Sequence, residues 1–130
     1  PAWRDVIDDY LDKIIKAGFD GVYLDIVDAF DYYEDKKVKA KLMFDLIKHI
    51  RKYAQERTKN FYIFQQNATS LISYLDKPSD LKGVVDALGV ESAFFRGDKL
   101  MNNPYAPIFP QLVPHWLLTN QSLNLGVQKI

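Results

Sequence analysis

Amphipathic helices and apolar strands alternate along the first 91 residues of this 130-residue chain. Helical segments are recognised by apolar residues at three- and four-residue spacing, and strands by short apolar runs. We expect, in order, a helix over 2–17, a strand over 19–25, a helix over 38–57, a strand over 61–65, a short helix over 68–75, a turn over 78–83 and a strand centred on 87–90. This order is typical of βα units around a parallel sheet.

The expected strand at 19–25 is continuously apolar rather than alternating, which indicates that both of its faces are covered. An acidic, aromatic loop with room for one helical turn follows over 26–36. In the helix expected over 38–57, one stripe should face the core. It consists of Leu42, Met43, Leu46, Ile47, Ile50, Tyr53 and Ala54.

Three parallel strands are too few for a stable sheet of their own, and a (β/α)8 barrel needs ~250 residues. We therefore expect an α/β fold in which residues 1–130 form a single partial domain, about half of such a TIM barrel. The chain would then be a fragment, a truncated relative, or a sheet completed by self-association or by the missing half of the barrel.

Charge and composition exclude several classes of protein. Lys plus Arg and Asp plus Glu number 17 each, so no net charge favours nucleic acid or an anionic membrane. The chain has no cysteine, which excludes disulfides, thiolate zinc sites and a cysteine nucleophile. Its apolar runs are too short to span a bilayer, and no signal peptide is visible at the N-terminus.

Polar side chains follow each of the three expected strands, with Asp25 after the first, Gln66 and Asn67 after the second, and Glu91 after the third. The carboxyl ends of parallel strands lie along one edge, which is where ligands bind in α/β folds. Two carboxylates across a cleft are what glycosidic bond cleavage requires. We predict Asp25 and Glu91 as the catalytic pair, with the two amides binding sugar hydroxyls or orienting the carboxylates.

Simpler roles compete with these. Asp25 would serve equally as a helix or loop cap, and Glu91 as a partner in a surface salt bridge. Asp28 is a candidate substrate ligand, a cap or a partner of Asp25; the Asp25 and Asp28 spacing also suits a hard cation. No glycine-bearing calcium loop surrounds the two acids, so we expect no metal and no cofactor. Tyr23 is a candidate sugar contact, against the simpler role of an aromatic core residue.

Other polar residues are weaker candidates. The loop acids Asp31, Glu34 and Asp35 are expected to form a solvated rim that would also favour a cationic substrate. His49 is expected to pack or to lie on the surface, and a ligand role for His115 has no support in its surroundings.

Three segments together resemble the endo-α-1,4-polygalactosaminidase family of glycoside hydrolases. They are Gly18-Phe-Asp-Gly-Val-Tyr-Leu-Asp-Ile-Val-Asp28, then Gln66-Asn67, and finally Gly89-Val-Glu-Ser-Ala-Phe-Phe95. The opening Pro1-Ala-Trp3 is also similar to the segment that precedes the first helix in that family. The resemblance covers about residues 1–95.

The resemblance implies a TIM barrel in secreted or cell-envelope proteins that act on polysaccharides containing α-1,4-linked galactosamine. It also implies that Asp25 is the nucleophile and Glu91 the general acid/base of a retaining mechanism. An acidic mouth would suit a positively charged amino sugar. The alternative is a non-catalytic carbohydrate-binding or structural half-barrel, because the other strands of a barrel are not part of this sequence.

Overall fold

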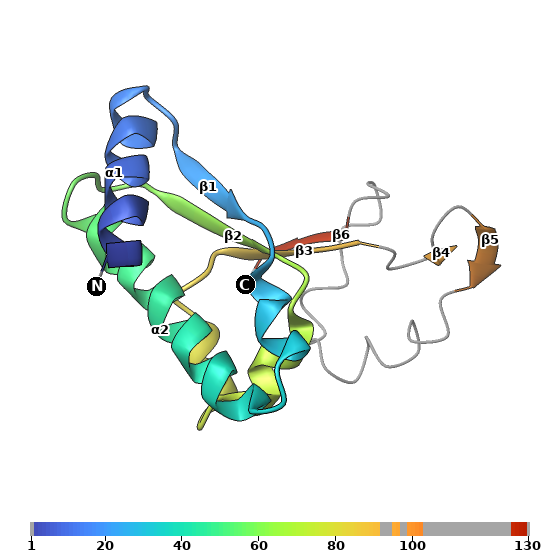
Figure 1. The fold of residues 1–130 in the computed structure, drawn as a ribbon. Helices are drawn as coiled ribbons and strands as arrows, with labels where there is room; N and C mark the ends of the chain where they lie inside the picture. The colour runs from blue at the N-terminus through green and yellow to red at the C-terminus, as the bar shows by residue number, and fades with distance from the viewer. Residues whose placement is uncertain (1, 92–94, 97–98, 103–125, 130) are drawn as a thin grey trace.

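A computed structural model of the chain describes residues 2–91, 95–96, 99–102 and 126–129 (Figure 1). The helices are α1 (Ala2–Lys16) and α2 (Lys36–Gln55), and the 3-10 helices are η1 (Val27–Tyr32), η2 (Thr69–Tyr74) and η3 (Pro78–Leu81). The strands are β1 (Gly21–Leu24), β2 (Tyr62–Gln66), β3 (Ala87–Val90), β4 (Phe95–Arg96), β5 (Lys99–Asn102) and β6 (Gly126–Lys129). Each helix and strand expected within residues 2–91 is present, with boundaries that differ by a few residues.

The first three strands form a parallel sheet in the order β1-β2-β3, as the alternation of helices and strands predicts. β1 and β2 pair from Gly21 opposite Tyr62 to Leu24 opposite Gln65, and Gln66 lies opposite Gly89 of β3. The mixed α/β fold with its βα units is consistent with part of a TIM barrel.

A fourth strand, β6, pairs antiparallel with β3 at the edge of this sheet, and β4 and β5 form a separate antiparallel pair. Strand β6 was not predicted, because the last dozen residues are polar and lack the apolar pattern of a buried strand.

Helices α1 and α2 lie on the same side of the sheet and pack on each other (Figure 1). The expectation that both faces of β1 are covered is wrong: Tyr23 is 51% exposed, whereas Val22 and Leu24 pack against the core. The described residues cover only the helix side of β1. The apolar run therefore has an open face that carries the strand-end groups.

The buried side of α2 is rotated from the stripe that its spacing indicated. Ile47, Ile50 and Ala54 are buried as expected, but Leu42 is 57% exposed. Phe44 and Arg51 are buried instead. The stripe was wrong at Leu42 and omitted two buried residues, of which Arg51 was missed because an arginine does not register as apolar.

Arg51 of α2 joins the segments that immediately precede β2 and β3. Its guanidinium donates to the carbonyl oxygens of Val84 (2.9 Å) and Phe61 (2.7 Å) and pairs with the carboxylate of Asp86. The same carboxylate oxygen of Asp86 accepts a hydrogen bond from the backbone N–H of Ile63 at 2.7 Å. A buried guanidinium needs such a full set of acceptors, so this network fixes one end of the sheet.

Polar contacts join the two helices. The Nε2 atom of His49 lies 2.7 Å from Oδ1 of Asp8, and Nε of Arg57 donates to Oδ1 of Asp12 at 2.8 Å. His49 thus has a packing role, as expected, whereas His115 lies outside the described residues. Across the ranges that the structure describes, no helix has the length and apolar character needed to cross a bilayer.

Candidate active site

The chain makes a similar tight turn after β1 and after β2. Ile26 has a φ of 56°, and Asn67 and Ala68 have φ values of 54° and 53°, so three residues with side chains occupy the left-handed region. The 3-10 helices η1 and η2 begin immediately after these turns. A β-branched residue such as Ile26 rarely adopts this conformation, and non-glycine residues held in it cluster at functional sites.

Glu91, one residue beyond β3, is held by both amides of the neighbouring turn. Nε2 of Gln66 donates to its Oε1 at 2.6 Å, and Nδ2 of Asn67 donates to its Oε2 at 3.2 Å. The backbone N–H of Glu91 donates in turn to Oδ1 of Asn67 at 2.9 Å. Gln66, Asn67 and Glu91 therefore form one connected group, and the amides orient this carboxylate.

Asp25 follows the last paired residue of β1, in line with Gln66 of β2. Its side chain is exposed, and Oδ1 accepts a hydrogen bond from the backbone N–H of Ile26 at 2.7 Å. This local bond fixes the carboxylate at the start of the turn. It fits the capping alternative and also leaves the carboxylate accessible to a ligand.

The pKa of Tyr23 depends on the charges of both carboxylates, Asp25 and Glu91. This pKa is raised above the ordinary tyrosine value, first by partial burial and then by the negative charges of Glu91 and Asp25. Both acids therefore act on the same phenol on the open face of the sheet. The Tyr23 hydroxyl is protonated at neutral pH, as that of an ordinary tyrosine is, and can therefore donate a hydrogen bond.

Gly89 makes room for this tyrosine. A Cβ atom at position 89 would overlap the Tyr23 hydroxyl and would lie 2.9 Å from Cζ of the ring. The ring of Tyr23 therefore extends from β1 over the sheet to β3. No pattern in the sequence marks Gly89 for this role, which becomes visible only from the position of the Tyr23 ring.

Asp28 is half-buried on η1, on the turn that follows Asp25. Nearby Asp31 accepts a hydrogen bond from Oγ of Ser70 at 2.9 Å and lies 3.5 Å from Nζ of Lys36. These contacts tie η1 to η2. Within the described ranges no three His, Asp or Glu side chains gather in a way that could hold a metal ion.

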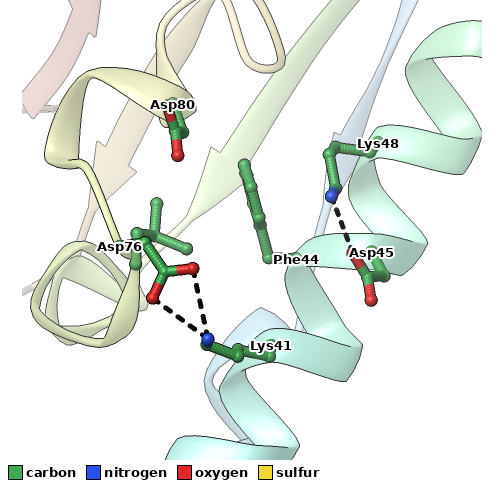
Figure 2. Close-up of a pocket in the computed structure, with 7 residues that line it drawn as sticks. Lys41, Phe44, Asp45, Lys48, Asp76 and Asp80 are labelled. Carbon is green, nitrogen blue, oxygen red and sulfur yellow. Dashed lines mark hydrogen bonds and ion pairs between the residues drawn. The ribbon is translucent and has the colours of Figure 1, made fainter.

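A hollow lies on the helix side of the sheet, between α2 and the segment that follows η2 (Figure 2). Lys41 donates to both carboxylate oxygens of Asp76, at 3.0 and 3.2 Å, and Lys48 pairs with Asp45 at 2.7 Å. The hydrogen bond from Lys41 and its charge lower the pKa of Asp76. The two lysines thus pair with two of the three carboxylates that line the hollow, Asp76 and Asp45.

The model of glycoside-hydrolase family GH114 matches residues 1–92. The chain belongs to this family. The match includes the three strand-end groups Asp25, Gln66–Asn67 and Glu91, although Ser92 to Phe94 of the third resembling segment lie outside the described residues. Family GH114 includes endo-α-1,4-polygalactosaminidases and has the TIM-barrel fold, in agreement with the parallel βα units of this chain.

Three curated relatives of this GH114 chain are uncharacterized proteins. The one from Methanocaldococcus jannaschii is 42% identical over 102 residues, which cover 75% of this chain and 29% of the relative. Those from Thermotoga maritima and Deinococcus radiodurans are 31% and 32% identical, and each match covers 72% of this chain. The chain thus spans less than a third of the length of these relatives, at 29% to 30% of each.

Proposed function

We propose that this chain carries the catalytic carboxylates of a glycoside hydrolase that cleaves polysaccharide containing α-1,4-linked galactosamine. One observation carries the proposal: Asp25 and Glu91 follow β1 and β3, the two parallel neighbours of β2, and Gln66 at the end of β2 donates to Glu91. On this proposal the pair converges on one place at the carboxyl edge of the sheet, where active sites of α/β folds lie.

In the proposed retaining mechanism, Asp25 attacks the anomeric carbon and the glycosidic bond breaks as Glu91 protonates the leaving oxygen. Water then releases the sugar from the enzyme, with Glu91 acting as base. Such a mechanism requires carboxyl groups ~5–5.5 Å apart. In this scheme Gln66 and Asn67 orient Glu91, and Tyr23 and Asp28 contact the sugar.

Charge supports galactosamine as the sugar of this substrate. Asp25, Asp28 and Glu91 place three acids around the turns, and an amino sugar with a free ammonium group complements them. A neutral sugar would lack this charge complementarity. We also propose an extracellular or cell-envelope location, where a polysaccharide of this kind would be met.

The second candidate is carbohydrate binding without catalysis. Its support is the exposure of Asp25, Tyr23 and Glu91 on an open face, because a catalytic pair normally works in a site closed from water. On this hypothesis the same residues bind glycan and no product forms.

The deciding experiment measures product release from an α-1,4-galactosamine polymer by the full-length protein and by Asp25→Asn and Glu91→Gln variants. We expect turnover to fall by roughly 10³-fold or more in both variants, because each removes a reacting group. Asp20→Asn is the control: Asp20 is an exposed acid near the opposite end of β1. Glycan binding without any product in the unmodified protein would support the second candidate.

A further inference from the structure

The turn after β2 has a feature that a regular strand cannot produce: two consecutive side chains reach the same carboxylate. Gln66 and Asn67 both donate to Glu91. Successive residues of a strand point to opposite faces. Gln65 is fully buried on the helix side, so a regular strand would place Gln66 on the open face and return Asn67 to the helix side.

The left-handed conformation of Asn67 resolves this conflict. At a φ of 54°, Asn67 departs from the strand and its amide reaches Glu91 beside that of Gln66. Its backbone N–H still donates to the carbonyl oxygen of Gly89 at 2.6 Å, so contact with β3 continues. Asparagine is among the few residues other than glycine that adopt this conformation readily.

Gln65 stabilises this turn from the helix side of the sheet. Its Nε2 donates to the carbonyl oxygens of Asn67 at 3.0 Å and Ala68 at 3.3 Å, the two residues in the left-handed region. Its Oε1 is buried and has no hydrogen-bond partner among the described residues. A buried amide with an unpaired oxygen is costly, so the contacts of Nε2 explain why glutamine occupies this position.

We infer that Gln65 is a positioning residue for Glu91 and acts through Asn67. Gln65 fixes the left-handed turn, the turn aims the amide of Asn67, and that amide fixes both the carboxylate and the backbone N–H of Glu91. The kinetic consequence of this inference rests on the proposed function, whereas the structural consequence does not.

The structural test is hydrogen exchange of the Glu91 backbone amide in the 130-residue chain, followed by NMR. Asn67→Gly removes the acceptor of this N–H but keeps a residue that adopts the left-handed conformation without strain. We expect exchange of the Glu91 amide to accelerate at least about tenfold in Asn67→Gly and in Gln65→Leu. Gln55→Leu, at the exposed end of α2, should leave it unchanged. If Gln65→Leu does not fold, Gln65→Met takes its place.

The kinetic test is a double-mutant cycle in the full-length protein on an α-1,4-galactosamine polymer. Gln65→Leu should lower kcat roughly 10- to 100-fold with KM little changed, since a misplaced catalytic group loses turnover rather than ground-state binding. In the Asn67→Gly background the same substitution should have no further effect on kcat. A purely structural role for Gln65 would give effects that add.

The two proposals fail in different ways. If the hydrogen-exchange rate of the Glu91 backbone amide is unchanged in Gln65→Leu or in Asn67→Gly, the positioning role is overturned, even if the protein cleaves the polymer. If exchange of the Glu91 amide accelerates in both variants as expected but the unmodified protein releases no product, the proposed function is overturned and the positioning role remains intact.

Discussion

Asn67 and Glu91 form a reciprocal pair: Nδ2 of Asn67 donates to Oε2 of Glu91 at 3.2 Å, and the backbone N–H of Glu91 donates to Oδ1 of Asn67 at 2.9 Å. One amide thus fixes both the side chain and the backbone of the acid. Glu91 is the first residue after β3, so without this pair its position would depend on the strand end alone.

The pKa of Tyr23 should report the charge of both proposed catalytic acids. Glu91→Gln and Asp25→Asn each remove a negative charge that opposes ionisation of the phenol, so each should lower the pKa of Tyr23. The effect of partial burial, which is the largest, should remain in both variants. Titration of the Tyr23 ring by ¹³C NMR measures the shift, and an unchanged pKa in both variants would contradict the proposed convergence.

The same raised pKa predicts how stability depends on alkaline pH. In the unfolded chain Tyr23 ionises near pH 10, whereas in the folded protein it ionises at higher pH. The unfolded state therefore loses this proton first, and the contribution of Tyr23 to stability falls as pH rises through about 10. Urea unfolding of the unmodified protein and of Tyr23→Phe across this range should diverge, with the unmodified protein losing more stability.

Gly89→Ala should destabilise the fold by about 1–3 kcal/mol, because the new methyl group meets the hydroxyl and ring of Tyr23. Adding Tyr23→Leu should recover part of this loss, since the clash disappears with the ring. The measurement is urea unfolding of the two single variants and the double variant. Purely additive effects would show that Tyr23 does not lie against Gly89.

Asp86→Ala should cost about 2–4 kcal/mol of unfolding free energy, because it leaves Nη2 of the buried Arg51 guanidinium and the backbone N–H of Ile63 without their acceptor. Asp80→Ala, at an exposed acid of η3, is the control and should stay within about 0.5 kcal/mol. Equal effects of the two substitutions would show that the network beneath the sheet contributes nothing.

Lys41→Met should raise the pKa of Asp76, because it removes the hydrogen bond and the positive charge that lower it. With the lowered pKa, the contribution of Asp76 to stability is present above the pKa of an ordinary aspartate and is lost as pH falls through the lower value. Carboxyl ¹³C titration of Asp76 measures the change, and Lys37→Met should produce a smaller one, because the charge of Lys37 has the smallest effect on this pKa.

The order of helices and strands was predictable because apolar periodicity records which side of each element meets the core. The strand-end residues Asp25, Gln66, Asn67 and Glu91 were predictable for a related reason: parallel strands bring their carboxyl ends to one edge. The structure then showed how the amides contact Glu91, which spacing alone left open. Whether these residues perform catalysis stays a prediction.

Other features depend on contacts that a pattern of apolar residues does not encode. The exposure of Tyr23 followed from a sheet face that the described residues leave open, and the burial of Arg51 followed from acceptors on the segments that precede β2 and β3. The role of Gln65 depends on two left-handed residues after it. Backbone conformation of this kind is a tertiary property, and Ala68 carries no local signal for it.

The network of Arg51 and Asp86 lies where β2 and β3 begin, whereas Glu91 and its amides lie where the same strands end. Substitutions at the ends of the strands therefore leave the contacts that hold their beginnings untouched. A protein built in this way can exchange one substrate for another over evolutionary time, or in directed evolution, without first acquiring a new way to fold.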